Sequence, residues 1–156
     1  MTVNKREKIV ICLSDKPELI KPLYRLAGSE IFKNKEVHLV NVFAQEIYAY
    51  EFSPYVWPDE KLFLELKASV EQGMKKTADD LFPNAADRAH VYVHCFLHHS
   101  PKQKITEYLK EIDASMVVVA TRGTHGLKGL FTSSTAEHLM KFSPCDVYVL
   151  RTVEEE

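Results

Sequence analysis

The segment between residues 120 and 137 is the part of the chain best suited to bind an anion. It contains three of the five glycines, at positions 123, 126 and 129, followed by three hydroxyl residues, Ser133, Ser134 and Thr135. Glycines let a backbone approach a ligand closely, and the start of a helix offers unpaired N–H groups and the positive end of the helix dipole. The pattern therefore indicates a phosphate cradle. The alternative is that the hydroxyls only cap a helix, with Glu137 completing a capping box to Ser134.

Five short apolar runs alternate with longer amphipathic stretches, and these elements must position the glycine-rich segment. The first and fourth runs are almost continuously apolar, which is typical of strands covered on both faces in a parallel sheet. The fourth run ends where the glycine-rich segment begins. The expected strands are residues 8–13, 36–42, 90–96, 115–120 and 146–150.

Two helices are predicted in the first half of the chain. Pro17 is suited to open the first, because the first helical turn does not need its N–H, provided that Pro22 still falls within that turn. Asp59 is placed to cap the second, over residues 60–81, which ends before Pro83. The expected core positions are Leu19, Leu23, Leu26, Ala27 and Ile31 in the first helix, and Leu62, Leu66, Val70 and Met74 in the second.

Two further helices are predicted in the second half. Ser100 and Pro101 start one of them, and Ser133 or Ser134 caps the other, which ends at Pro144. The expected inward positions are Ile105, Tyr108, Leu109 and Ile112 in the former, and Ala136, Leu139, Met140 and Phe142 in the latter.

This alternation predicts an α/β fold, a three-layer sandwich with helices on both faces of a five-stranded parallel sheet. We expect a single domain over residues 1–156, with its core at about residues 7–151. An open sheet of this kind binds ligands beyond the carboxyl ends of its strands, where the strand order reverses. The glycine-rich segment follows the fourth strand and would lie at that edge.

Composition narrows the partners and the location. A formal net charge of −2 leaves no basic excess for a nucleic acid, and no run approaches the roughly 18 apolar residues that span a bilayer. Cys12, Cys95 and Cys145 are odd in number and have apolar neighbours, which favours buried thiols in a reducing compartment. The expected location is the cytoplasm, without nucleic acid or membrane partners.

The sequence lacks three common catalytic and nucleotide-binding motifs. The chain has no Gly-x-Ser-x-Gly elbow, no full P-loop motif and no dinucleotide fingerprint. A reactive cysteine needs a positively charged and partly exposed setting, whereas Cys12 and Cys95 fall inside predicted strands. We therefore expect no catalytic residues and no enzyme, apart from slow incidental ATP hydrolysis.

Four of the seven histidines gather at positions 90, 94, 98 and 99. In a strand, His94 and His98 would share a face. No cysteine or carboxylate nearby clearly completes a tetrahedral ligand set, so no metal site is predicted.

The glycine-rich segment resembles the motif of universal stress proteins that bind ATP. That motif has a glycine, two residues, a glycine, nine residues, and then a glycine followed by Ser or Thr. The same spacing here starts at Ala120, reaches Gly123 and arrives at Ser133 and Ser134. The flanking residues 121–123, 135–137 and 143–147 are also similar to the family, and the resemblance covers about residues 7–151.

The resemblance implies a nucleotide-binding-like open fold with strand order 3-2-1-4-5, binding ATP or AMP with magnesium. Gly123, Gly126, Ser133, Ser134 and Thr135 would surround the phosphates, and Arg122 would neutralise them. Val42 would lie beside the adenine, and Ser14 or Asp15 near the ribose or the metal. Three positions depart from the family: Ala120 and Ser133 replace motif glycines, and Ser14 stands where ATP-binding members have Asp.

Two questions of function stay open at this point. The alternative to a nucleotide-binding stress-response module is a family member that has lost the nucleotide and acts through protein contacts, with the aromatic-rich residues 44–58 as one candidate surface.

The last strand is apolar on both faces and no helix follows it, which favours pairing with a second copy. Similar family members dimerise through this strand, so a homodimer through Val147 and Val149 is expected; the alternative is a monomer whose edge is blunted by Arg151 and the acidic tail.

Overall fold

The computed structural model describes residues 5–14, 17–44, 60–121 and 135–152. These residues form a five-stranded sheet in the order β3-β2-β1-β4-β5, in which all four neighbouring pairs are parallel. The predicted class, strand order and parallel pairing are confirmed. The strands are β1 (Lys8–Cys12), β2 (Glu36–Ala44), β3 (Val91–His98), β4 (Met116–Thr121) and β5 (Asp146–Arg151).

The two most apolar strands lie side by side at the centre of the sheet. Residues Ile9 to Cys12 of β1 pair with Met116 to Val119 of β4. Both strands are buried on both faces, because successive side chains point to opposite layers and each layer is filled. The continuous apolar runs of the sequence follow from this position.

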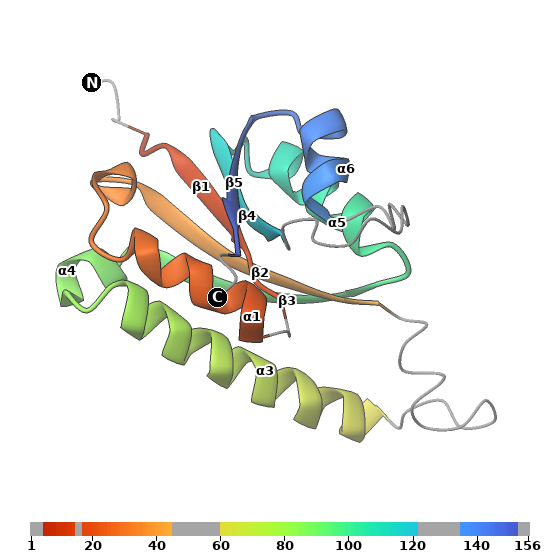
Figure 1. Ribbon diagram of the computed structural model, residues 1–156. Helices are drawn as coiled ribbons and strands as arrows, with labels where there is room; N and C mark the ends of the chain where they lie inside the picture. The colour runs from red at the N-terminus through yellow and green to blue at the C-terminus, as the bar shows by residue number, and fades with distance from the viewer. Residues whose placement is uncertain (1–4, 15–16, 45–59, 122–134, 153–156) are drawn as a thin grey trace.

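Helices cover both faces of the sheet, as Figure 1 shows, with α1 and α3 on one side and α5 and α6 on the other. One core cluster lies beneath α3 (Glu60–Leu81) and includes Ile9, Leu39 and Leu81. The other lies beneath α5 (Pro101–Glu111) and α6 (Thr135–Phe142) and includes Val10, Leu109 and Leu139. The predicted three-layer arrangement is therefore present.

The first predicted helix is the main correction to the secondary structure. One continuous helix was expected, but the chain forms a short α1 (Pro17–Ile20), a 3₁₀ helix η1 (Lys21–Leu26) and a second one, η2 (Glu30–Phe32). Pro22 lies in the first turn of η1 and has no N–H for an α-helical hydrogen bond. Gly28, with φ of +72°, then turns the chain before η2. Leu23 and Leu26 are nevertheless buried as expected.

The long and middle helices agree closely with prediction. Helix α3 has the expected bounds, with Met74 buried on its inner face. Helix α5 begins after Ser100, whose side chain accepts a hydrogen bond from the N–H of Gln103. A four-residue helix, α4 (Ala85–Arg88), was not predicted; the side chain of Asn84 caps it.

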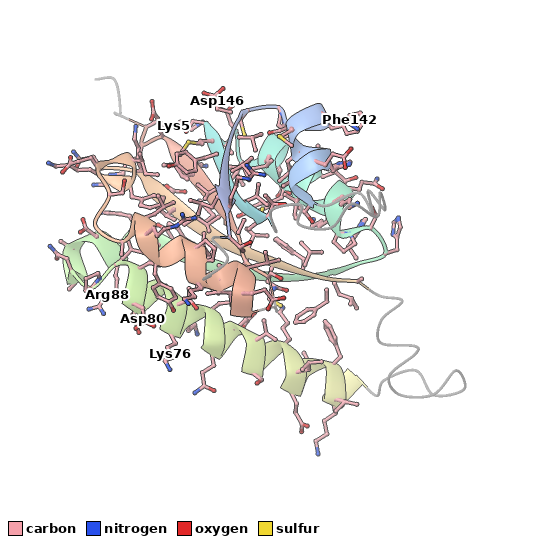
Figure 2. All side chains as sticks on the ribbon, in the orientation of Figure 1. Lys5, Lys76, Asp80, Arg88, Phe142 and Asp146 are labelled. Atoms are coloured by element: carbon pink, nitrogen blue, oxygen red, sulfur yellow. The ribbon has the colours of Figure 1, made fainter. Side chains whose placement is uncertain are left out.

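Helix α6 buries a narrower stripe than expected. Ala136 and Leu139 are buried, but Met140 and Phe142 are each 61% exposed, which contradicts their predicted inward positions. These two residues flank the buried stripe on opposite sides, and α6 packs against β4 and the edge strand β5. Figure 2 shows Phe142 projecting outward from the helix.

The difference between the two α6 positions is testable by truncation. Leu139→Ala removes a fully buried side chain and is expected to lower the free energy of unfolding by about 2–5 kcal/mol. Met140→Ala, one residue along, is the matched control and is expected to change it by less than about 0.5 kcal/mol. Urea unfolding measures both changes. Equal losses for the two variants would contradict the observed orientation of α6.

Candidate functional site

The strand order reverses between β1 and β4. From β1 the chain passes to β2 on one side, while β4 lies on the other side, and the two strands pair up to Cys12 and Val119. In open parallel sheets the crevice at such a reversal is where ligands bind. The helices that follow the two strands diverge, since α1 lies against one face and α6 against the other. The geometry therefore provides a candidate site at the carboxyl ends of β1 and β4.

Four of the predicted site residues are described by the structure, and three of them lie near the carboxyl ends of neighbouring strands. Cys12 pairs with Val40, so extending the register by two residues brings Ser14 level with Val42. Ala120, one residue beyond the pair of Cys12 with Val119, lies level with Leu13. The sheet therefore brings Ser14, Val42 and Ala120 to adjoining strand ends.

The remaining site residues concern the start of α6 and the two flanking loops. Thr135 is the first residue of α6 and is half-buried. Asp15, Arg122, Gly123, Gly126, Ser133 and Ser134 lie outside the described residues. The predicted helix cap at Ser133 or Ser134, and the cap at Asp59, lie outside them as well.

The first turn of α6 carries a carboxylate that is paired one turn further along. Glu137 accepts a hydrogen bond of 2.8 Å from the Nζ of Lys141. This bond and the charge of Lys141 lower the pKa of Glu137, to which Lys102 adds a smaller effect. The first turn of α6 therefore carries a negative charge, which a helix N-terminus favours.

Asn41 was missed at the sequence level and lies near the strand ends. It is a buried polar residue of β2, and its Nδ2 donates a 3.0 Å hydrogen bond to the carbonyl oxygen of Leu13, at the end of β1. The available signal was a single amide side chain between Val40 and Val42 in an otherwise apolar run. Its partner, 28 residues away, could not be identified from the sequence.

A second group of polar side chains lies on the α5 face of the sheet, away from the strand ends. His38 Nε2 donates to the carboxylate of Glu36 at 2.7 Å, because an ionised carboxylate can only accept. His38 Nδ1 lies 3.0 Å from His94 Nε2 and 2.9 Å from the hydroxyl of Tyr108. The sequence drew attention to His94 but not to His38, which pairs with it across the β2–β3 boundary.

The histidines of β3 do not assemble a metal centre within the part of the chain that the structure describes. No group of three or more His, Cys, Asp or Glu side chains is placed there to hold a metal ion. His94 contacts His38, while Nδ1 of His98 lies within hydrogen-bond distance of the Ser100 backbone. These two histidines therefore have separate partners although the strand places them on one face.

The three cysteines are free thiols in apolar surroundings. Burial raises the pKa of Cys12 to about 12 and that of Cys95 to about 11. Burial also raises the pKa of Cys145, which is half-buried beside Ser143. At neutral pH all three are protonated, so the thiol at the end of β1 supplies no nucleophile to the candidate site.

None of the described helices combines the length and the apolar character that a membrane span requires.

Sequence comparison places the chain among universal stress proteins. The profile of the universal stress protein family matches residues 5–151. A universal stress protein of Methanocaldococcus jannaschii is 28% identical over 141 residues, which cover 83% of this chain and 80% of that protein. Universal stress protein E of Photorhabdus laumondii is 26% identical over 139 residues, and the match covers 86% of this chain but 40% of the longer relative.

Solved structures share the fold. A hypothetical protein solved as a structural genomics test case matches with a TM-score of 0.70 at 18% identity, over 96% of this chain and 98% of that one. A universal stress protein in complex with cAMP matches with a TM-score of 0.60 at 14% identity, over 95% and 98%. A family protein of Arabidopsis thaliana with AMP bound matches with a TM-score of 0.59 at 11% identity, over 94% and 92%. At these identities the likeness shows the fold.

The pairing of His94 with His38 predicts a loss of stability in mild acid. Burial and the nearby His38 hold the pKa of His94 below its usual value of 6.5. As the pH falls through 6.5, His94 binds a proton in the unfolded chain before it does so in the folded chain. The contribution of His94 to the free energy of unfolding is therefore complete above pH 6.5 and is lost as the pH falls towards the lower pKa of the folded state. Urea unfolding between about pH 5 and pH 7.5 is expected to show a smaller decrease for His94→Gln than for the wild type.

The matched control for this experiment is His99→Gln, because His99 is an exposed histidine five residues further along. This variant is expected to keep the pH dependence of the wild type. A decrease in acid that is unchanged in His94→Gln would contradict the effect assigned to the half-buried His94 and its contact with His38.

Proposed function

Because the chain belongs to the universal stress protein family, we propose that it binds an adenine nucleotide, ATP or AMP, at the carboxyl ends of β1 and β4. The observation that carries this proposal is the position of Ser14 and Ala120 on the two strands between which the strand order reverses. Proteins with this fold have been solved with cAMP and with AMP bound. The spacing from Ala120 to Ser134 is that of the ATP-binding family motif.

Each proposed contact follows from the position of its residue in the chain. Val42, level with Ser14 on the neighbouring strand, offers an apolar surface to the adenine. Ser14 or Asp15 contacts the ribose or a magnesium ion. The proposed phosphate contacts are Gly123, Gly126, Ser133, Ser134 and Thr135, with Arg122 supplying positive charge.

The proposed role is that of a stress-response signalling module in the cytoplasm. In this role, nucleotide binding changes the stability and the surface of the protein, and this change carries the signal without a chemical reaction. The protonated state of the buried thiols supports this, because Cys12 cannot act as a nucleophile at neutral pH.

The second candidate is a member of the family that has lost the nucleotide and acts through protein contacts. The observation that favours it is the replacement of two motif glycines, by Ala120 and Ser133, and of the family Asp by Ser14. Positions 120 and 133 thereby lose the glycines that let a backbone approach a ligand closely.

Calorimetric titration with AMP and with ATP plus magnesium separates the two candidates. The proposal predicts binding heat and a rise in stability of about 2.7 kcal/mol when the free ligand is at one hundred times its Kd. Gly123→Leu places a bulky side chain in the proposed cradle and is expected to abolish both effects. No heat and no thermal shift at millimolar nucleotide would support the second candidate instead.

Gly73→Leu is the matched control for the glycine experiment. A Cβ at Gly73 meets nothing within 4 Å, and the residue lies on the exposed side of α3. Its nucleotide affinity is expected to equal that of the wild type. A loss of binding in this variant as well would show that the effect of Gly123→Leu is not specific to the cradle.

We further propose that two copies pair through β5, as a two-fold homodimer. The N–H of Thr152 donates to Thr121 in β4, so even-numbered residues of this strand direct their backbone groups inwards. Alternation then directs the backbone groups of Val147 and Val149 to the open edge. An antiparallel register that uses both of them pairs Val147 with the partner's Val149 and places Tyr148 on the two-fold axis.

This register predicts a specific disulfide. Non-hydrogen-bonded antiparallel pairs have Cα atoms about 4.5 Å apart, which a disulfide can span. Tyr148→Cys is therefore expected to give a covalent dimer under mild oxidation, detected by non-reducing electrophoresis. Tyr92→Cys, an equally exposed tyrosine position on the opposite edge strand, is the control and is expected to stay monomeric on the gel. A monomer in sedimentation at micromolar concentration would overturn the pairing.

A further inference from the structure

Asn41 is a buried amide of β2, a strand whose other buried side chains are apolar except for that of His38. It is 7% exposed and lies in β2 between Val40 and Val42. Burying an amide is costly unless its polar atoms are hydrogen-bonded. The Nδ2 of Asn41 meets this requirement by donating to the carbonyl oxygen of Leu13 at 3.0 Å. The side chain therefore links the interior of β2 to the end of β1.

Leu13 is held at both of its backbone groups by β2. Its N–H donates to the carbonyl oxygen of Val40 at 2.8 Å, and its own carbonyl accepts from Asn41. The register of β1 with β2 ends at the pair of Cys12 with Val40. The side-chain amide of Asn41 thus adds one more hydrogen bond between the two strands beyond that pair.

The location of this bond relates it to the candidate site. Leu13 directly precedes Ser14, which stands at the carboxyl end of β1, and its own side chain is buried in the core beneath α3. A residue fixed at its N–H, its carbonyl and its side chain determines the direction in which the chain leaves the strand. The position of Ser14 therefore depends on Asn41.

We propose that Asn41 is a positioning residue, which fixes the end of β1 so that Ser14 meets the ribose or metal of the bound nucleotide. The inference rests on the proposed nucleotide site. Without the amide donor, the carbonyl of Leu13 loses its buried partner. An unsatisfied buried carbonyl costs free energy, so the end of the strand is expected to change direction until this oxygen has another donor.

Two substitutions remove the donor in different ways. Asn41→Asp keeps the shape, but an ionised carboxylate only accepts and so faces the Leu13 carbonyl with like partial charge. Asn41→Leu keeps the approximate volume without any polar atom. Both variants are expected to weaken AMP or ATP binding by about tenfold, as removal of one buried hydrogen-bond partner does. Asn41→Leu guards against a failure of the aspartate variant to fold.

Thr77→Val is the matched control. Thr77 is 8% exposed, and its hydroxyl donates to the carbonyl of Gly73 within α3. It is thus another buried polar residue with one backbone acceptor, on an element outside the strand ends. It is expected to lower stability to a similar extent while leaving the nucleotide Kd unchanged, which separates positioning from a general loss of stability.

Amide hydrogen exchange followed by NMR tests the positioning without any ligand. The amide of Leu13 is expected to exchange at least about tenfold faster in Asn41→Leu than in the wild type, at conditions where Thr77→Val leaves it unchanged. The ¹⁵N and ¹H shifts of Ser14 are expected to change in the same variant.

The outcomes distinguish the two proposals. Unchanged exchange at Leu13 and unchanged shifts at Ser14 overturn the positioning role of Asn41. Altered amides with an unchanged nucleotide Kd overturn the link between this residue and the ligand. A wild-type protein that binds no nucleotide overturns the proposed function, and with it the ligand part of this inference, while the amide measurements still decide the positioning of Ser14.

Discussion

The structure depends on the parallel pairing of β1 with β4 at the centre of the sheet. Parallel strands need crossover connections, and these place helices on both faces, so the central strands are buried on both sides. The side chains of Val10 and Val117 lie in one core layer, and those of Ile11 and Val118 lie in the other. The same pairing creates the reversal of strand order, because β2 and β5 extend the sheet in opposite directions from this pair. The pairing of β1 with β4 therefore determines both the two core layers and the position of the candidate site.

Most of the fold could be predicted because its signals are local. Continuous apolar runs identified the central strands, and a long amphipathic stretch gave α3 its bounds. The errors arise where local spacing competes with another constraint. Pro22 turned a helical spacing into a 3₁₀ helix, and Met140 and Phe142 are exposed beside the narrow buried stripe of α6 despite their apolar character.

The candidate site was predictable only in part, because its residues are brought together by register and not by sequence spacing. Ser14, Val42 and Ala120 could be selected from the family motif and the strand ends. The bond from Asn41 to Leu13 could not, since it joins residues 28 positions apart through a side chain. The contact of His38 with His94 spans 56 positions and escaped prediction for the same reason. A buried polar residue in an apolar strand signals that a partner exists without identifying it.

The departure at Ser14 bears on which nucleotide the proposed site would favour. A carboxylate at the end of β1 supplies both a negative charge and an oxygen ligand that magnesium prefers, whereas a serine hydroxyl is neutral. With Ser14 in this position, the carboxylate nearest in sequence is that of Asp15. A nucleotide with fewer phosphates needs less metal to neutralise its charge, so the proposed site would favour AMP over ATP with magnesium. Ala120 has no part in this balance, because its methyl group packs against the core beneath α3.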